Sequence, residues 1–223
     1  MRPRFWLLEQ ATRRPARLDK TNLKVRHIHC PVNSEHTATS GRLSRLSIII
    51  PTRYVGDFVW TWFSEVLVGP RARDFMRKHR LTGYSLNRAK AKFHNPDYGT
   101  PPPLWEFKTL GWGGIAARAS GVKLAESCAE CGLLEYSIPD PSRLIDPKRW
   151  DGSDFFMVWP LPLYMFLSDR AGTLLRQVKF KGISVIPAEE LKLHSSDTVA
   201  PGRLSHHMPL GRAKELGSAL GIV

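Results

Sequence analysis

The sequence contains only three cysteines and no long hydrophobic run. Its 223 residues include Cys30, Cys128 and Cys131, an odd number that argues against the paired disulfide framework of a secreted protein. No segment approaches the ~20 consecutive apolar residues of a membrane span. The apolar run at Phe5–Leu8 is too short for the core of a signal peptide. We therefore expect a cytoplasmic protein without membrane contacts.

Recognisable catalytic motifs are missing as well. The sequence has no glycine loop with P-loop spacing, no Gly-x-Ser-x-Gly elbow and no His-Glu-x-x-His. Asp57 and Asp154 each precede an expected strand, where capping of a turn is the simpler role for an aspartate. The adjacent pair Glu189 and Glu190 is interpreted as a solvated surface rather than a catalytic pair. The sequence therefore predicts a protein that is not an enzyme.

What the sequence has in excess is positive charge, with 33 Lys and Arg against 20 Asp and Glu and a net charge of +13. Such a balance favours an acidic partner, whether nucleic acid, anionic lipid or an acidic protein face. A general solubilising role of the charge is the alternative. The densest basic stretch could form a nucleic-acid face, although the solvated outer side of a helix explains the same residues. Its candidate contact residues are Arg73, Arg77, Lys78 and Arg80.

Two stretches of the chain repeat one order of residues. Asp57-Phe58 matches Asp154-Phe155 at an offset of 97, and Trp62 matches Trp159 at the same offset. Beyond a short insertion the offset becomes 99, with Arg71-Ala72 on Arg170-Ala171 and Gly83 on Gly182. Each stretch favours strand, helix and strand in that order, with the first helix over residues 71–80 and the second beginning after Ser168-Asp169. Matching apolar faces and turn glycines indicate a repeated supersecondary unit.

We therefore predict an α+β fold in which two similar strand-helix-strand units flank a small Cys-x-x-Cys-Gly element, either zinc-ribbon-like or a degenerate ribbon. For the C-terminal tail, a short helix over residues 210–220 and disorder are alternatives. The predicted segments are 1–45 for an N-terminal strand and Cys/His turn, 46–95 for the first unit, 96–150 for a connector with the cysteine turn, 151–195 for the second unit and 196–223 for the polar tail.

Cys128-Ala-Glu-Cys131-Gly132 is the most distinctive local motif. Two thiolates three positions apart can chelate one metal ion when the chain turns between them, as in half of a zinc ribbon. Cys30 and one nearby histidine would complete four ligands for a structural zinc ion, with His29 as the first choice and His27 or His36 as alternatives. Metal-free thiols in a degenerate turn are the competing interpretation. Thioredoxin-like redox chemistry is disfavoured, because residues 133–138 favour a strand where that motif needs a helix.

Together these motifs resemble the bacterial double-CxxCG-motif proteins, a paralogous family notable in myxobacteria and related to contact-dependent immunity proteins. The resemblance covers residues 27–193. It lies in the order of an early Cys-Pro turn, Gly-Asp-Phe-Val-Trp, Gly-Trp-Gly-Gly, Cys-x-x-Cys-Gly, Asp-Phe-Phe, Ser-Asp-Arg and Lys-Gly-Ile-Ser-Val-Ile-Pro-Ala-Glu-Glu. The family's two cysteine turns imply a zinc ribbon with four thiolates. This chain departs from that pattern at the first turn, where Asn33 replaces the second cysteine and Ser34 replaces the glycine.

For function, the resemblance implies a cytoplasmic protein that binds and neutralises a cognate toxin. Our first hypothesis is therefore a non-enzymatic protein-binding module, an immunity protein with a toxin as its partner. The second is a basic, zinc-ribbon-like protein that binds nucleic acid through the stretch around Arg77. Zinc would have a structural role in either case.

Overall fold

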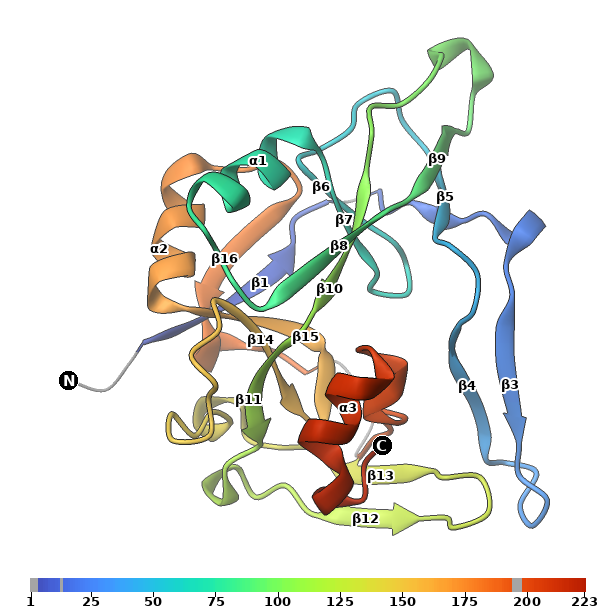
Figure 1. Ribbon diagram of the computed structural model, residues 1–223, viewed down its shortest axis with the longest axis vertical. Coiled ribbons are helices and arrows are strands. Elements are labelled where there is room, and N and C mark those ends of the chain that lie inside the picture. The colour runs from blue at the N-terminus through green and yellow to red at the C-terminus, as the bar shows by residue number, and fades with distance from the viewer. Residues whose placement is uncertain (1–3, 13, 194–197) are drawn as a thin grey trace.

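The computed structural model describes residues 4–12, 14–193 and 198–223 (Figure 1). The protein is α+β, as predicted, with more residues in strands than in helices. No helix in this described part combines the length and apolar character needed to cross a bilayer. The α-helices are α1 (Pro70–Lys78), α2 (Asp169–Val178) and α3 (Leu210–Gly217). The strands are β1 (Phe5–Gln10), β2 (Arg17–Leu18), β3 (Val25–His29), β4 (Thr37–Arg42), β5 (Ser47–Ile50), β6 (Phe58–Trp60), β7 (Val66–Val68), β8 (Tyr84–Arg88), β9 (Lys90–Phe93), β10 (Trp105–Thr109), β11 (Gly111–Ile115), β12 (Leu124–Ser127), β13 (Leu134–Ser137), β14 (Phe155–Trp159), β15 (Leu161–Ser168), β16 (Ile183–Pro187) and β17 (Thr198–Val199).

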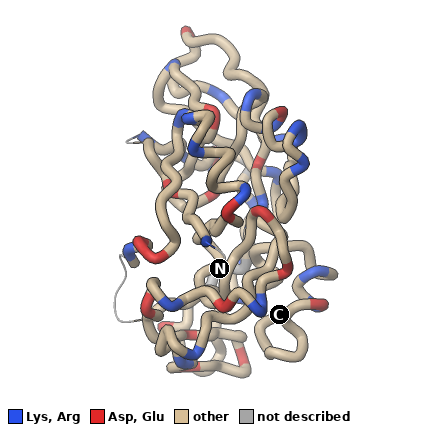
Figure 2. The backbone as a smooth tube through the Cα atoms, turned by 90° about the vertical axis from the view of Figure 1, so that its left-hand side faces the viewer, with Lys and Arg blue, Asp and Glu red and all other residues tan. Residues whose placement is uncertain are grey.

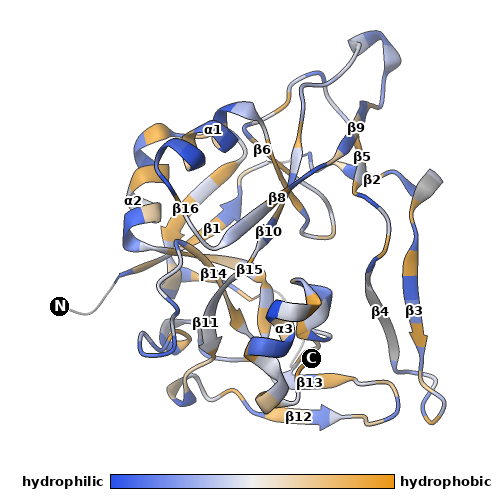
Figure 3. Cartoon of the chain, in the orientation of Figure 1, coloured by the Kyte–Doolittle hydropathy of each residue, from blue (hydrophilic) through white to orange (hydrophobic). Residues whose placement is uncertain are grey.

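Two sheets form the body of the molecule. The larger has the strand order β11-β14-β15-β1-β16 and the smaller has the order β6-β7-β10-β8. All five residues of β14 are buried, and its apolar sequence is visible beside β15 in Figure 3. Because both faces of β14 are covered, the strand is a continuous apolar run instead of an alternating one.

Helices α1 and α2 lie side by side over these sheets (Figure 1). Their inward residues, among them Met76 on α1 and Leu175 on α2, belong to one apolar core that draws on both sheets. Phe180, which follows α2, packs against β6 and α1, with its ring 5.8 Å from that of Phe58 and 5.2 Å from that of Phe75. Burial of aromatic rings of this size is worth roughly 2–3 kcal/mol each. This shared core joins the two sheets into one body.

The aspartate before β6 links the first half of the chain (residues 1–98) to the second half (residues 99–223). The Asp57 carboxylate pairs with the guanidinium of Arg71 at 2.8 Å and accepts a hydrogen bond from the backbone N–H of Lys181, also at 2.8 Å. The N–H of Phe58 donates to the carbonyl of Lys181 in return, at 3.0 Å. Asp57 therefore has a structural role between the halves, beyond the turn cap predicted for it.

The aspartate before β14 makes the same contacts in the opposite direction. The Asp154 carboxylate pairs with Arg170 at 2.7 Å and accepts from the backbone N–H of Thr82 at 3.0 Å. It also accepts from the hydroxyl of Ser168 at 2.8 Å. The N–H of Phe155 donates to the carbonyl of Thr82 at 3.0 Å. Each half thus holds the turn that follows the other half's helix.

One inner strand of each of these two sheets comes from outside the stretches expected to form the two units. β1 lies between β15 and β16, and β10 lies between β7 and β8. Both strands are antiparallel to their two neighbours. The paired residues are Trp6 with Leu167 and Pro187, and Trp105 with Val68 and Arg88. Each sheet therefore depends on a segment distant in sequence from the helix that covers it.

The matched tryptophans occupy different environments. Trp159 is fully buried, whereas Trp62 is 69% exposed in the turn between β6 and β7. The buried residue at the corresponding place is Trp60, whose carbonyl accepts from Ala16 just as that of Trp159 accepts from Ala116, both at 2.7 Å. The offset of the sequence match slips by two residues within these strands, because β14 has five residues where β6 has three, and its pairing with β15 is irregular between Phe156 and Val158.

Three smaller sheets surround the body. β2, β5 and β9 form one, and β12, β13 and β17 form another. In the part of the chain that the structure describes, β3 pairs with β4 alone. The β3–β4 hairpin is an arm alongside the body (Figure 1). The tail, for which a helix and disorder were alternatives, contains α3, whose Ala213 packs with Leu204 and Ile222. Residues 194–197 lie outside the described part of the chain.

Candidate metal centre

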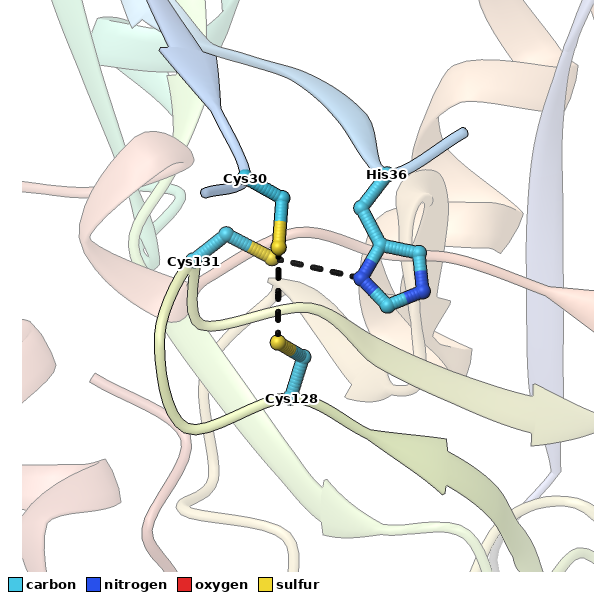
Figure 4. A group of neighbouring side chains, drawn as sticks. All are labelled: Cys30, His36, Cys128 and Cys131. Carbon is cyan, nitrogen blue, oxygen red and sulfur yellow. Dashed lines mark hydrogen bonds between the residues drawn. The ribbon is translucent and has the colours of Figure 1, made fainter. Parts of the chain in front are cut away.

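Four side chains from distant parts of the sequence converge where the turn of the arm meets the turn between β12 and β13. They are Cys30, His36, Cys128 and Cys131, and we call them the metal cluster (Figure 4). Their ligand atoms all lie within 4.8 Å of one another. The Sγ atoms of Cys30 and Cys128 are 3.7 Å apart, and the Sγ of Cys131 lies 3.7 Å from Nδ1 of His36. These four residues could hold a metal ion.

The spacing of the cluster fits a tetrahedral ion. Zinc binds thiolate sulfur at about 2.3 Å and imidazole nitrogen at about 2.0 Å, so neighbouring ligand atoms around one ion lie roughly 3.5–3.8 Å apart. Both measured separations, 3.7 Å, fall in that range. A disulfide between Cys30 and Cys128 would instead require a sulfur–sulfur distance of about 2.0 Å.

The turn at residues 128–133, which we call the second turn, joins β12 to β13. The N–H of Cys128 donates to the carbonyl of Leu133, and the N–H of Gly132 donates to the carbonyl of Cys128. Gly132 has a φ of +75°, and a Cβ added there would lie 2.9 Å from the guanidinium of Arg203. Only glycine adopts this conformation without strain, which explains the glycine after the second cysteine of the motif.

The turn at residues 30–36, the first turn, joins β3 to β4 and is built differently. The side-chain oxygen of Asn33 accepts from the N–H of Glu35 at 2.9 Å, and its backbone carbonyl accepts from the N–H of His36 at 3.1 Å. This Asx turn replaces the geometry that a Cys-Gly pair gives the second turn. It brings the ring of His36 to the position that a second cysteine would otherwise fill.

The structure distinguishes the three histidines that the sequence left open. His36, one of the two alternatives, is the histidine of the metal cluster. His29 and His27 are both exposed on β3 and lie outside that cluster. His29 was the first choice from the sequence; the spacing Cys30-x5-His36, which leaves room for a turn between two strands, is the signal that could have favoured His36 instead.

Glu126, which the sequence analysis did not single out, orients the histidine. Its Oε1 lies 2.9 Å from Nε2 of His36. The amide nitrogen of Asn33 is 3.0 Å from the same ring nitrogen, but the carboxylate accepts a proton more strongly, so we assign the hydrogen to Nε2. That tautomer leaves the lone pair of Nδ1 facing the thiols. A carboxylate behind a ligating histidine is a common arrangement in zinc sites.

The surroundings of the thiols separate their pKa values. The backbone N–H of Cys131, with help from His36, lowers the pKa of Cys128 to about 6. Burial raises the pKa of Cys131. The nearby Cys128 and Cys30 sulfurs raise the pKa of His36. Near neutral pH the second turn therefore presents one thiolate, while a metal ion would displace protons from the other groups.

The basic stretch lies elsewhere in the molecule. Arg77, Lys78 and Arg80 are exposed at the end of α1, whereas the half-buried Arg73 pairs with Asp74 and stacks 4.1 Å from the ring of Trp105. Figure 2 shows several Lys and Arg positions along the backbone in the upper part of the side that carries the helices. The metal cluster lies at the other end, beside β12 and β13 (Figure 1). The structure thus does not bring the two sites together.

Comparison of the chain with known protein families and with curated proteins gives no match.

Proposed function

We propose that the protein is a non-enzymatic binding protein in which a structural zinc ion fastens two hairpins together. The observation that carries this proposal is the metal cluster, with its three sulfurs and one nitrogen at tetrahedral spacing. Four protein ligands fill the coordination sphere of zinc and leave no position for a substrate, which is the pattern of structural zinc sites. Sulfur and imidazole ligands favour zinc over magnesium or calcium.

Elemental analysis tests the zinc. Protein purified under reducing conditions without added metal is expected to contain one zinc per chain, and a Cys128→Ser/Cys131→Ser variant is expected to contain none. His29→Ala, which changes an exposed histidine outside the cluster, serves as the matched control and should keep its zinc. Wild-type protein that takes up no zinc on reconstitution would contradict the proposal.

For the partner we propose a protein, and a cognate toxin is the partner that the resemblance to contact-dependent immunity proteins implies. The positive net charge of +13 supports a partner with an acidic face. Co-expression with a toxin domain encoded beside this gene should restore growth, and the two proteins should purify as a 1:1 complex. If co-expression gave no rescue and the two proteins did not co-purify, that result would count against this partner.

Nucleic-acid binding is the second candidate, and the exposed cations at the end of α1 favour it. Affinity for a duplex should then fall linearly with salt concentration on logarithmic axes. Arg77→Glu and Arg80→Glu should reduce that slope. Binding that is absent or independent of salt would eliminate this candidate.

We further infer that the scaffold is a tandem duplication whose halves exchange one inner strand each, β1 and β10. The eight residue pairs of β10 with β7 and β8 each have a counterpart among those of β1 with β15 and β16, always 99 positions away. The reciprocal contacts of Asp57 and Asp154 support the same relation. Cys30 and Cys128, 98 positions apart, then become equivalent residues of the two halves. The metal cluster would join one turn from each half.

Separate expression of the halves tests this inference. The chain can be divided at the exposed turn at Gly99, where nothing lies within 4 Å of an added Cβ. Fragments 1–98 and 99–223 should assemble into a 1:1 complex that binds zinc, because each supplies an inner strand of the other's sheet. Fragments that do not associate when co-expressed would contradict the exchange.

A further inference from the structure

A cavity of about 560 Å³ lies between the arm and the body. This volume is within the range of ligand-binding pockets. Six separate segments contribute to its wall, namely the chain around β2, the arm, the β6–β7 turn, the second turn, β15 and the tail after β17. Most of the wall is apolar. Its apolar side chains include Leu18, Leu23, Val25, Ile28, Phe63 and Leu163.

The metal cluster closes one end of this cavity. Cys131, Gly132 and Leu133 of the second turn are part of its wall. At the other end, the arm continues into β2 and β5, which pair through Arg17 and Ile49. The arm is thus held at both ends, and the metal ion that we propose would fix the cavity's shape.

Two large apolar side chains stand exposed along the cavity. Phe63 is 66% exposed and Leu163 is 57% exposed, and both line the wall. Exposed aromatic and aliphatic groups beside a concave surface are typical anchors of protein interfaces. The neighbouring Trp62 is 69% exposed but does not line the cavity. The pair Trp62 and Phe63 therefore offers two adjacent aromatic residues of similar exposure, of which Phe63 alone lines the cavity.

The charges around the cavity favour an acidic occupant. Lys20, Arg42 and Arg203 line it, against one carboxylate, that of Glu65. Arg42 is in turn paired with Glu106 at an adjoining hollow. Burial lowers the pKa values of two further wall residues, His206 and His207, the latter to about 4, so both are neutral near pH 7. The fixed charges of the wall are thus positive on balance.

The arm also has an unpaired edge. Within the described residues, β4 pairs with β3 and with no other strand, and it lies on the side of β3 that faces the body (Figure 1). Gly41 and Arg42 of β4 line the cavity. Free backbone groups at a strand edge can pair with an added strand. An occupant in extended conformation could use these groups, whereas a compact small molecule would not.

We propose that the cavity binds an extended, acidic segment of a protein partner, which adds a strand to β4 and packs apolar side chains against Phe63 and Leu163. This inference rests on the proposed protein-binding function and assigns it a site. Successive side chains of the added strand would point in opposite directions and make different contacts. Those facing the body would contact the apolar wall, and acidic ones would meet Lys20 and Arg203.

Selection from a displayed library of random twelve-residue peptides on the zinc-loaded protein tests the proposal. The selected peptides should combine apolar residues with Asp or Glu. Their affinity, measured by fluorescence anisotropy, should fall at least about tenfold for Phe63→Glu and for Leu163→Glu. Trp62→Glu, the matched control, should change affinity less than about twofold. Because all three positions are exposed, the variants should fold, and their zinc content reports this directly.

Backbone hydrogen exchange provides a second measurement. Bound peptide should slow exchange at β4 amides, whereas an occupant held by side chains alone would leave those amides unprotected and would contradict strand addition. Peptides that bind Phe63→Glu as tightly as the wild type, or a library that yields nothing above background, would overturn the site. These outcomes differ from failure of the proposed zinc function, which the metal content of the wild-type protein measures before any peptide is added.

Discussion

The two turns of the metal cluster reach the same geometry by different chemistry. The second turn has two cysteines and a glycine with φ of +75°. The first has one cysteine, an Asx turn at Asn33, and a histidine six residues after the cysteine. Both present two ligand atoms to one point in space. Replacement of a cysteine thus does not abolish a site when the loop can bring another ligand to the vacated position.

The difference also makes the two turns unequal. In the second turn, backbone N–H groups stabilise the thiolate of Cys128, and the ligands are held by a tight loop. In the first, the ligand position of His36 depends on two further side chains, that of Asn33 within the turn and that of Glu126 on β12. Substitutions can therefore separate the contribution of each turn, and we order them below by the size of the expected effect.

Cys131→Ser should have the largest effect, because it removes a buried ligand from the rigid second turn. We expect loss of zinc and a fall in melting temperature on the order of 10 °C, which corresponds to about 3 kcal/mol in a chain of this size. Calorimetry with and without a chelator measures the shift. If the cluster binds no metal, the chelator will leave the wild-type melting temperature unchanged.

His36→Ala should weaken zinc binding by more than about 100-fold, since loss of a ligand exceeds the usual effect of losing a group that merely orients one. His29→Ala and His27→Ala should leave affinity unchanged, because both rings are exposed on β3 outside the cluster. Competition with a chromophoric chelator gives the three affinities. If His29→Ala weakened zinc binding as much as His36→Ala, the assignment of His36 as the histidine ligand would be contradicted.

Asn33→Cys in the His36→Ala background should restore much of the lost affinity. The double variant recreates in the first turn the Cys-x-x-Cys spacing of the second, so a fourth thiolate becomes available to the ion. Cobalt substitution tests this outcome, since the thiolate-to-cobalt charge-transfer absorption should rise with the fourth sulfur. No recovery would mean that the two turns are not interchangeable and would weaken the inferred duplication.

Glu126→Gln should lower zinc affinity by roughly tenfold, because the neutral amide holds the Nε2 hydrogen of His36 less strongly. Glu135→Gln, at the position paired with Glu126 on β13, is the control, because the carboxylate of Glu135 accepts from Thr198. A Glu126→Gln affinity equal to that of the wild type would show that His36 needs no such support.

Alkylation of the metal-free protein should reveal the smallest difference, that between the thiols of the second turn. A thiol with a pKa of about 6 is mostly thiolate at pH 7, whereas burial keeps Cys131 protonated. Iodoacetamide should therefore modify Cys128 several-fold faster, and its rate should rise with pH through about 6 and then level off. Peptide mass spectrometry measures both sites. Faster reaction at Cys131 would reverse the assignment.

Local sequence was sufficient for much of the framework. The 3- and 4-residue spacing of Ala72, Phe75 and Met76 predicted α1, and its range 71–80 differs from Pro70–Lys78 only at the ends. The cap at Ser168 predicted the start of α2, and Ser168 indeed accepts from the N–H of Ala171. The motif at Cys128–Gly132 predicted a chelating turn between strands. These features depend on contacts between residues close in sequence, so the sequence carries their full signal.

What the sequence alone determined, then, is the α+β class, the two helices and a cysteine turn that needs further ligands. Tertiary structure decided which histidine joins the cysteines, because His29 is adjacent to Cys30 along the chain, yet the β3–β4 hairpin brings the more distant His36 to the thiols. It also decided that β1 and β10 complete the two sheets. The pairing of residues as far apart as Trp6 and Leu167, and the meeting of Cys30 with Cys128, follow from the packing of the whole chain, and no local pattern records them.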